Sequence, residues 1–261
     1  MEKIALIYDF DYTLCTKDTP NFGLFELYNL NDEFFVNVNH KAREMNMEGN
    51  LAYLYFLNEH AKNCGKPLTK QILSKAGENI QFFPGVETWF ERINRFGKEN
   101  GVEVEHYLIS SGILEIIEGS PIAKNFKKIF ASSYHYNKDG VADWPLCCIN
   151  YTNKTQFIYR INRGLLNNID DDLLNGYFPK EKRAVKYENM IYIGDGFTDV
   201  PGMKTTIQKG GLSIAVYGET SKVANELLKY GRCNKICKAD YREGKDLEKY
   251  VQEKILQVKN V

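Results

Sequence analysis

The sequence predicts an α/β protein, in which helices cover a parallel sheet and a small helical module is inserted after the first strand. Two observations predict this class. Short apolar segments that suit buried strands alternate with segments of helical periodicity, as they do in proteins with a parallel sheet. Between residues 15 and 83, in contrast, only helical patterns follow one another.

The composition is that of an ordinary soluble protein, and it leaves the choice of partner to local sites. Hydrophobic residues make up 43% of the 261 positions, and 34 basic residues balance 34 acidic ones. Because the net charge is zero, we expect no general attraction to nucleic acid or to an anionic membrane. The apolar run at the N-terminus is too short for a signal peptide, and no segment approaches transmembrane length. We therefore expect a cytoplasmic protein; the oligomeric state is not indicated.

The six cysteines have no regular spacing and are expected to be free thiols. Cys147 and Cys148 are adjacent, which is awkward for two independent disulfides. Cys233 and Cys237 are close in sequence, but no second cluster of Cys or His lies near them. Two packed thiols are therefore a better interpretation than a zinc site.

The first predicted strand, residues 4–8, leads directly to two carboxylates, Asp9 and Asp11, with Thr13 following. In an open parallel sheet, the carboxyl ends of the strands form the ligand crevice. Two like charges at that place need a cation, most simply Mg²⁺, since oxygen ligands suit it. An acidic turn after an edge strand is the alternative interpretation.

Helical spacing governs the segment that follows. Leu51, Leu54 and Leu57 give one apolar face, and Thr69 can cap a helix. Pro84 and Gly85 mark the return to the main domain, where the next helix is expected. The three helices of the module are predicted over residues 32–46, 50–63 and 69–76.

The second strand is predicted over residues 102–109, and it ends at Ser110, Ser111 and Gly112. Hydroxyl and backbone N–H groups at a strand end beside a helix N-terminus can hold phosphate oxygens. A serine N-cap followed by a glycine turn would explain the same residues without a ligand.

A helix over residues 153–164 carries Lys154 in its first turn. The helix dipole disfavours a cation there, which suggests a function for this lysine, although a solvated lysine is the alternative. Before this helix, a strand at residues 128–134 leads through the turn Asn137–Gly140 into a hairpin that ends near residue 146. The polar segment 165–189 is expected to be helix and loop on the outside.

Residues 190–193 are another predicted strand with carboxylates at its end. Asp195 lies between Gly194 and Gly196, and Asp199 falls near the start of the following helix. The remaining predicted elements are strands at 212–217 and 235–239 and helices at 221–230 and 245–258.

In their order and contexts, D-F-D-Y-T, S-S-G, Lys154 and G-D-G-F-T-D resemble the motifs of the haloacid dehalogenase (HAD) superfamily. The resemblance spans residues 3–217 and is strongest to phosphoserine phosphatase-like members. It implies a Rossmann-like catalytic core, residues 1–15 and 84–261, and a helical cap domain of the first type, residues 16–83.

The resemblance also implies catalytic roles. Asp9 would be the nucleophile that forms an aspartyl phosphate, and Asp11 would protonate the leaving alkoxide and then activate water. Ser110, Ser111 and Lys154 would bind the phosphoryl oxygens.

A metal site follows from the same resemblance. Mg²⁺ would be held by the Asp9 carboxylate, the backbone carbonyl of Asp11 and Asp195, with Asp199 behind them or acting through water. The metal would neutralise carboxylates and phosphate together.

The implied function is Mg²⁺-dependent hydrolysis of a phosphate monoester of a small metabolite. Asp11 argues against dehalogenation, because a departing halide needs no proton. Two alternatives stay open: a catalytically weak protein that binds a phosphorylated ligand or partner, and phosphoryl transfer to an acceptor other than water.

In the cap, Asp18 and His60 match the positions with which phosphoserine phosphatases grip their substrate. A histidine in place of the expected arginine loses the bidentate grip on a carboxylate, which disfavours phosphoserine. Lys17, His40 or Arg43 would then supply different recognition.

Overall fold

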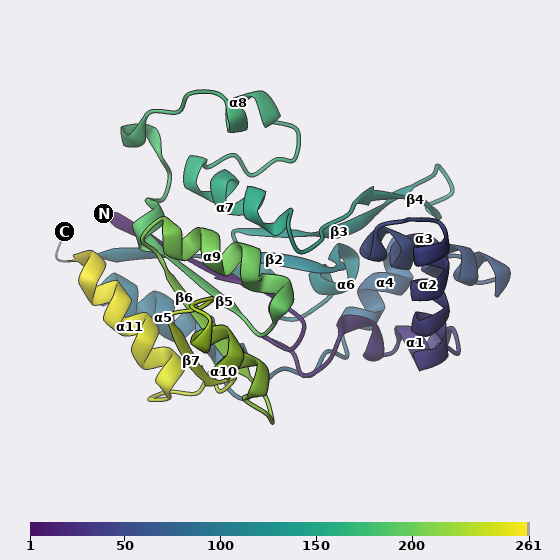
Figure 1. Cartoon of the computed structure of the whole chain (residues 1–261), viewed down its shortest axis with the longest axis horizontal. Helices are drawn as coiled ribbons and strands as arrows, with labels where there is room; N and C mark the ends of the chain where they lie inside the picture. Colours follow the sequence, from purple (N-terminus) through teal and green to yellow (C-terminus); the bar gives the residue numbers. More distant parts are fainter. Residues whose placement is uncertain (260–261) are drawn as a thin grey trace.

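A computed structural model, which describes residues 1–259, confirms the α/β class. Figure 1 shows a central sheet with helices on both sides and the helices α1 to α4 gathered at one end. Within these residues the sheet has seven strands in the order β4-β3-β2-β1-β5-β6-β7. They are β1 (Glu2–Tyr8), β2 (Val102–Ile113), β3 (Lys128–Tyr136), β4 (Ala142–Cys147), β5 (Met190–Gly194), β6 (Leu212–Tyr217) and β7 (Lys235–Lys238).

The strand order reverses at β1, which has β2 on one side and β5 on the other. All neighbouring strands are parallel except β3 and β4, which form an antiparallel hairpin. In such sheets, ligands bind in the crevice at the carboxyl ends of the strands where the order reverses. The ends of β1, β2 and β5 are therefore the place to look for a site.

The helices fall into two groups along the chain. Between β1 and β2 lie four helices and, after them, α5. These are α1 (Leu24–Leu27), α2 (Asp32–Glu44), α3 (Gly49–Asn63), α4 (Lys70–Gly77) and α5 (Val86–Glu99), with a 3-10 turn, η1 (Thr19–Asn21), before α1. The later helices are α6 (Leu114–Glu118), α7 (Lys154–Arg163), α8 (Asp171–Asn175), α9 (Val200–Gln208), α10 (Lys222–Lys229) and α11 (Asp246–Lys259).

Strand β1 is buried on both faces, as expected for the middle of a parallel sheet. Ile4, Leu6 and Tyr8 belong to the apolar cluster that includes α5 and α11. Ala5 and Ile7 belong to a second cluster, which includes α7, α9 and α10. The alternating side chains of one strand thus join two helical layers to the sheet.

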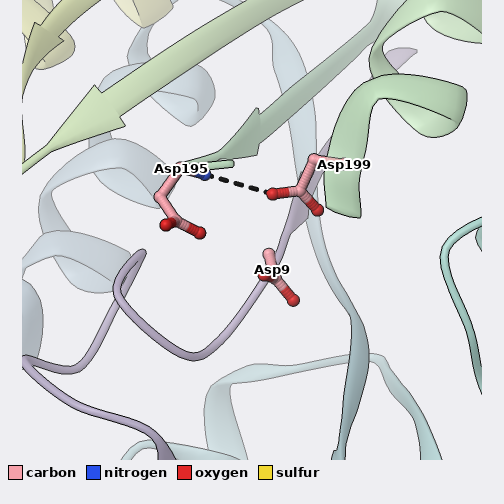
Figure 2. A group of neighbouring side chains, drawn as sticks. All are labelled: Asp9, Asp195 and Asp199. Carbon is pink, nitrogen blue, oxygen red and sulfur yellow. Dashed lines mark hydrogen bonds between the residues drawn. The ribbon is translucent and has the colours of Figure 1, made fainter. Parts of the chain in front are cut away.

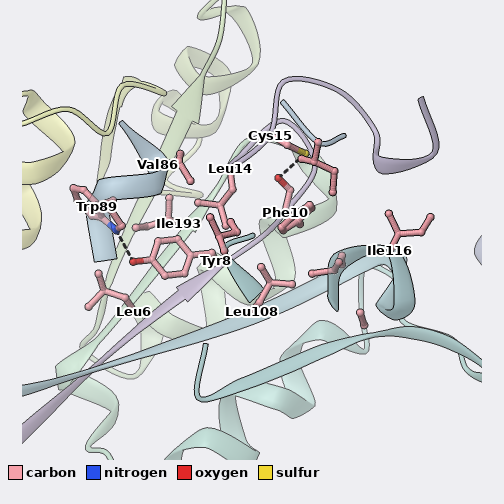
Figure 3. Packing of buried hydrophobic residues seen from close by; sticks show 14 of the residues in the cluster. Leu6, Tyr8, Phe10, Leu14, Cys15, Val86, Trp89, Leu108, Ile116 and Ile193 are labelled. Carbon is pink, nitrogen blue, oxygen red and sulfur yellow. Dashed lines mark hydrogen bonds between the residues drawn. The ribbon is translucent and has the colours of Figure 1, made fainter. Parts of the chain in front are cut away.

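A chain of hydrogen bonds crosses the first of these layers, and Figure 3 shows its first bond, from Trp89 to Tyr8. Trp89 Nε1 donates to the Tyr8 hydroxyl at 2.8 Å, and this hydroxyl lies 2.9 Å from His106 Nδ1. His106 Nε2 lies 3.0 Å from Asn94 Oδ1. A neutral imidazole satisfies this chain, since Nε2–H can donate to the amide oxygen while Nδ1 accepts the hydroxyl hydrogen.

The helical insert enters and leaves the sheet domain through two adjacent segments. Thr16 N–H donates to the Gln81 carbonyl at 3.0 Å, and Phe83 N–H donates to the Leu14 carbonyl at 3.0 Å. Residues 16–83, all of them described, contribute no strand to the sheet. The division into domains at residues 16 and 83 stays a prediction.

The insert is docked on the carboxyl ends of the strands. Helix α4 packs against α6 so closely that a Cβ atom at Gly119 would overlap the Ser74 carbonyl, which is why a glycine is needed there. From α3, Asn50 Nδ2 lies 2.8 Å from the Ile149 carbonyl and 3.2 Å from the Ser111 carbonyl. These contacts bring α3 and α4 to the end of the sheet where β1 and β2 stop.

Most predicted elements are confirmed within a few residues, but β2 is longer than predicted. It continues through Ser110 to Ile113, because pairing with β3 resumes at Ile113 and Ser132 after an irregularity. The short elements η1 and α1 were not predicted, since three or four residues are too few to show periodicity.

All six cysteines are free, as predicted. Cys233 and Cys237 are buried in the two different apolar clusters, so they lie on opposite faces of the sheet and do not form one metal site. In the part of the chain that the structure describes, no helix is long and apolar enough to cross a membrane.

Candidate active site

Three carboxylates from two neighbouring strand ends converge at the crevice (Figure 2). Asp9 follows β1, and Asp195 and Asp199 follow β5, which pairs directly with β1. One ligand atom from each carboxylate lies within 4.8 Å of the other two. Residues almost 190 positions apart in sequence are thus brought together by strand pairing.

Lys154, the first residue of α7, lies inside this group rather than in solvent. Its Nζ is 2.9 Å from Asp9 Oδ1 and 2.8 Å from Asp199 Oδ1, and the side chain is only 1% exposed. Burial acts to lower the pKa of Lys154, but the carboxylates of Asp199 and Asp9 outweigh it and raise the pKa. The lysine is therefore a permanent cation, held against the helix dipole by two carboxylates.

Asp199 is fully buried, and both of its oxygens are occupied. Oδ2 accepts the backbone N–H of Asp195 at 3.1 Å, and Oδ1 accepts the Tyr192 hydroxyl at 3.0 Å in addition to Lys154. A Cβ atom at Gly194 would overlap the Asp199 carboxylate, so only glycine fits before Asp195. Asp199 thus shapes the loop and orients Lys154.

The group carries more negative charge than its protein partners offset. Burial and the nearby Asp199 and Asp9 carboxylates raise the pKa of Asp195 to about 8. Burial and Asp199 raise the pKa of Asp9 to about 6, in spite of Lys154. Within residues 1–259, no lysine or arginine forms an ion pair with Asp195, whose contact with the Thr13 hydroxyl is long, at 3.5 Å.

This surplus of buried carboxylate oxygen fits a divalent cation. Mg²⁺ takes oxygen ligands and usually binds through one or two carboxylates together with waters and phosphate. Asp9 and Asp195 offer such ligands at less than 4.8 Å from each other. The residues present therefore suit the predicted metal, with Asp199 already engaged behind them.

The Asp11 carboxyl turns away from this group toward the insert. Its Oδ1 accepts the backbone N–H of Thr19 at 2.8 Å and lies 3.7 Å from the Cys15 thiol. Burial, and then the charges of Asp9 and Asp18, raise the pKa of Asp11 well above its usual range. A carboxyl in this state can keep a proton, as a general acid must.

Ser110 and Ser111 lie at the end of β2, next to Gly112. Ser110 is 1% exposed, and its Oγ accepts the Gly112 N–H at 3.0 Å. A Cβ atom at Gly112 would lie 3.2 Å from Ser110 Oγ and 3.4 Å from Asp11 Oδ2, so both oxygens border the same glycine. Ser111 is adjacent, with a buried hydroxyl. The phosphate-binding role of both serines stays a prediction.

A cavity of about 980 Å³ lies between these strand ends and the insert. Asp11, Ser111 and Gly112 line it from the sheet, but Asp9, which is 6% exposed, is not among its described lining residues. The insert and adjoining loops supply the remaining wall. That wall is formed by Tyr12, Lys17, Asp18, Thr19, Pro20, Asn21, Phe35, Asn39, Glu48, Gly49, Asn50 and Tyr53, with Ile113 and Tyr151 from outside the insert.

The two cap residues predicted for substrate recognition are placed differently. Asp18 lines the cavity and accepts the Tyr12 hydroxyl at 3.1 Å. His60 Nε2 lies 3.0 Å from the Tyr28 carbonyl and its ring meets Phe34 edge-on; it is not among the described residues that line the cavity.

Of the alternatives for substrate recognition, only Lys17 is among the described residues that line the cavity. Sequence reasoning missed Thr19, Asn50 and Tyr53, which also line it. Asn50 falls in the stretch M-E-G-N-L, which resembles phosphoserine phosphatase-like proteins but gave it no role, and Thr19 and Tyr53 fall in turn and helical patterns that core packing explains equally well.

No protein-family model matches the sequence. The chain is 28% identical to an uncharacterized protein of Borreliella burgdorferi over 280 aligned positions, which cover 97% of this chain and 96% of that protein.

Solved structures of described families are similar to the chain. A HAD family hydrolase from Salmonella enterica serovar Typhi has a TM-score of 0.58 and 18% identity; the match covers 85% of this chain and 64% of that one. A phosphoserine phosphatase solved as a phospho-aspartyl intermediate analogue has a TM-score of 0.57 and 18% identity, covering 97% and 99%. A probable phosphoserine phosphatase from Vibrio cholerae has a TM-score of 0.59 and 13% identity, covering 99% and 66%. At these identities, the likeness concerns the fold.

Proposed function

We propose that this chain, whose fold is that of HAD hydrolases and phosphoserine phosphatases, is a Mg²⁺-dependent phosphatase acting on a phosphate monoester of a small metabolite. The observation that carries the proposal is the buried group of Asp9, Asp195 and Asp199 around Lys154. A cytoplasmic location, and a partner that is neither nucleic acid nor membrane, are part of the proposal.

Hydrolysis would proceed in two steps. In the first, the Asp9 carboxylate attacks phosphorus, the ester bond breaks, and the leaving alkoxide takes the proton of Asp11. Lys154, 2.9 Å from Asp9, offsets negative charge on the phosphoryl oxygens together with Ser110. In the second step, ionised Asp11 takes a proton from water, which attacks the aspartyl phosphate and releases inorganic phosphate, restoring Asp9.

The metal would be held by Asp9, Asp195 and the backbone carbonyl of Asp11. When bound, Mg²⁺ would neutralise the carboxylates and polarise the phosphoryl group. Asp199 would act behind these ligands, since its oxygens already hold Lys154 and the loop after β5.

One observation favours the second candidate function, a protein that binds a phosphorylated ligand without fast turnover. Asp9 is 6% exposed and does not line the large cavity among the described residues. The low exposure of the nucleophile would slow its reaction with a bound ester. Phosphoryl transfer to an acceptor other than water uses the same first step.

The direct test is hydrolysis of nitrophenyl phosphate with Mg²⁺, with EDTA, and by Asp9→Asn. We expect EDTA to abolish turnover and Asp9→Asn to reduce it by at least about 10³-fold, because the nucleophile is lost. Asp172→Asn, an exposed carboxylate of α8, serves as the matched control. Undiminished turnover by Asp9→Asn would refute the mechanism, whereas tight binding of a phosphate ester without turnover by the wild type would favour the binder.

Thermal unfolding tests the metal separately. Mg²⁺ should stabilise the wild type by about 2.7 kcal/mol at a concentration one hundred times its Kd. Asp195→Asn should lose this response and, without metal, unfold at a higher temperature than wild type, because one buried like charge is gone. An equal response of both proteins to Mg²⁺ would exclude Asp195 as a ligand.

A further inference from the structure

The wall of the large cavity carries hydroxyl groups whose hydrogen-bonding capacity is unused. Thr19 Oγ1, Tyr53 Oη and Ser111 Oγ are buried, and among the residues that the structure describes none of them has a hydrogen-bond partner. All three residues line the cavity. Of the eight buried polar atoms without a partner among the described residues, three thus belong to residues of one cavity, and a ligand that reached them would complete their hydrogen bonds.

Thr19 lies next to Asp11, the residue proposed to protonate the leaving group of a phosphate ester. Its backbone N–H binds Asp11 Oδ1, and a Cβ atom at Gly112 would lie 3.2 Å from Thr19 Oγ1 and 3.4 Å from Asp11 Oδ2. The Thr19 hydroxyl is thus beside the carboxyl that would protonate the departing oxygen. It can reach substrate atoms next to the scissile bond.

On α3, Tyr53 carries another of the unpaired hydroxyls. Its ring stacks on Phe35 with centroids 5.9 Å apart and planes 18° from parallel. Burial, and then the charges of Asp11 and Asp18, raise the pKa of Tyr53, so its hydroxyl stays neutral. The stacked pair offers a neutral hydrogen-bond donor together with an apolar face.

Beyond Asp11, the charged side chains of the cavity wall are exposed, so they form no enclosed site for an ionised leaving group. No arginine or histidine is among its described lining residues, and its cation, Lys17, is exposed next to the exposed Asp18. Glu48 Oε1 and Oε2 accept the backbone N–H groups of Asn50 and Leu51 at 3.1 and 2.7 Å. A carboxylate of the substrate would thus lack a guanidinium, and an ammonium group would find at Glu48 an exposed carboxylate with part of its hydrogen-bonding capacity used in capping α3.

We infer that the leaving group is an uncharged alcohol with several hydroxyls, a polyol or a sugar, and that Thr19 and Tyr53 determine this specificity. Hydroxyls can both donate to and accept from the unpaired groups of the wall. The C–H faces of a polyol or sugar can pack on the Phe35–Tyr53 pair. The inference rests on the proposed phosphatase function and names the substrate class of the same site.

A comparison of substrates tests the class. We expect kcat/KM for sorbitol phosphate to exceed the values for phosphoserine and phosphoethanolamine by at least about 10-fold, because the charged groups find no partners. Preference for either charged ester would overturn the inference. Nitrophenyl phosphate distinguishes failure of the proposed function from failure of the substrate class. If it is not hydrolysed, the proposed phosphatase function fails. If it is hydrolysed but the polyol ester is not preferred, only the substrate class is refuted.

Two nearly isosteric variants test the residues. Tyr53→Phe and Thr19→Val should each lower the ratio of kcat/KM for sorbitol phosphate to that for nitrophenyl phosphate by about 10-fold, mainly through KM. Tyr55→Phe is the matched control, since Tyr55 lies on the same helix and is not among the described lining residues. An equal change of the ratio in Tyr53→Phe and Tyr55→Phe would overturn the assignment.

Discussion

The two halves of the site treat buried polar groups in opposite ways. The charged half is the group around Asp9. In it, Lys154 Nζ and both carboxylate oxygens of Asp199 have hydrogen-bond partners. In the cavity wall, the hydroxyls of Thr19, Tyr53 and Ser111 are buried without partners among the described residues. The difference teaches that Lys154 and Asp199 are held in place by the protein itself, whereas these hydroxyls are not.

The same difference sets the cost of substitutions. Removing one partner of a buried ion pair leaves an uncompensated charge, which is among the most destabilising changes known. Removing a hydroxyl that bonds to nothing loses almost no favourable interaction. Substitutions in the two halves should therefore differ strongly in their effect on the free energy of unfolding.

Lys154→Met should have the largest effect. It leaves Asp9 and Asp199 without their shared cation, and we expect a loss of about 3–5 kcal/mol in the free energy of unfolding, measured by urea denaturation. The double variant Lys154→Met, Asp199→Asn should recover part of the loss, because it removes one of the stranded charges. Wild-type stability of the single variant would contradict the comparison.

Acidification should destabilise the folded protein through His106, a hydrogen-bonded residue that lies away from the site. Burial lowers the pKa of His106 from 6.5 to about 3, so the folded state binds this proton only at a lower pH than the unfolded state does. The contribution of neutral His106 to the free energy of unfolding is complete above pH 6.5 and is lost as the pH falls from 6.5 toward 3. At pH 4 the loss is about 3 kcal/mol.

The measurement is urea denaturation of wild type and His106→Asn at several pH values. An asparagine amide can still accept the Tyr8 hydroxyl but does not titrate. The two proteins should diverge in pH dependence below pH 6.5. Parallel curves would mean that His106 is not a buried neutral imidazole.

Asn50 is a residue of the cavity wall whose side chain is paired, and it sharpens the comparison. Its amide lies between the Ile149 and Ser111 carbonyls, so Asn50→Ala should cost about 1–2 kcal/mol and loosen α3. Asn39→Ala, an exposed asparagine of the same cavity, should change stability by less than about 0.5 kcal/mol. Equal losses in both variants would show that this amide does not anchor the insert.

The smallest effect is expected for Tyr53→Phe. Because its hydroxyl has no partner among the described residues, the free energy of unfolding should change by less than about 0.5 kcal/mol. Tyr134→Phe provides the contrast, since its hydroxyl donates to the Leu54 carbonyl at 2.7 Å and should cost about 1 kcal/mol. A larger loss for Tyr53→Phe than for Tyr134→Phe would reverse the comparison.

The charged half could be predicted from sequence because strand ends fix it. Asp9 and Asp195 follow short apolar runs, and parallel pairing of β1 with β5 brings them together. Lys154 stood out because it opposes the dipole of its helix. Each signal has a local physical cause that the residue pattern retains.

The cavity wall could not be predicted in the same way. Tyr53 and Asn50 lie in α3, where an aromatic ring and a polar residue near the helix start look like ordinary packing and capping. Their meaning depends on how the insert docks on the ends of β2 and β3, a long-range contact that no local pattern encodes. For the same reason, a motif match alone did not predict that His60 lies at the Tyr28 carbonyl.

The hydrogen bond of Trp89 to Tyr8 has an optical consequence. The sequence contains two tryptophans, and they lie in contrasting surroundings: Trp89 is fully buried against β1, whereas Trp144 on β4 is 63% exposed. Emission from Trp89 should be blue-shifted and should report the integrity of the sheet, while Trp144 should emit as it does in water. A Trp144→Phe protein would thus carry a single tryptophan, whose emission wavelength reports on β1, the strand that Asp9 follows.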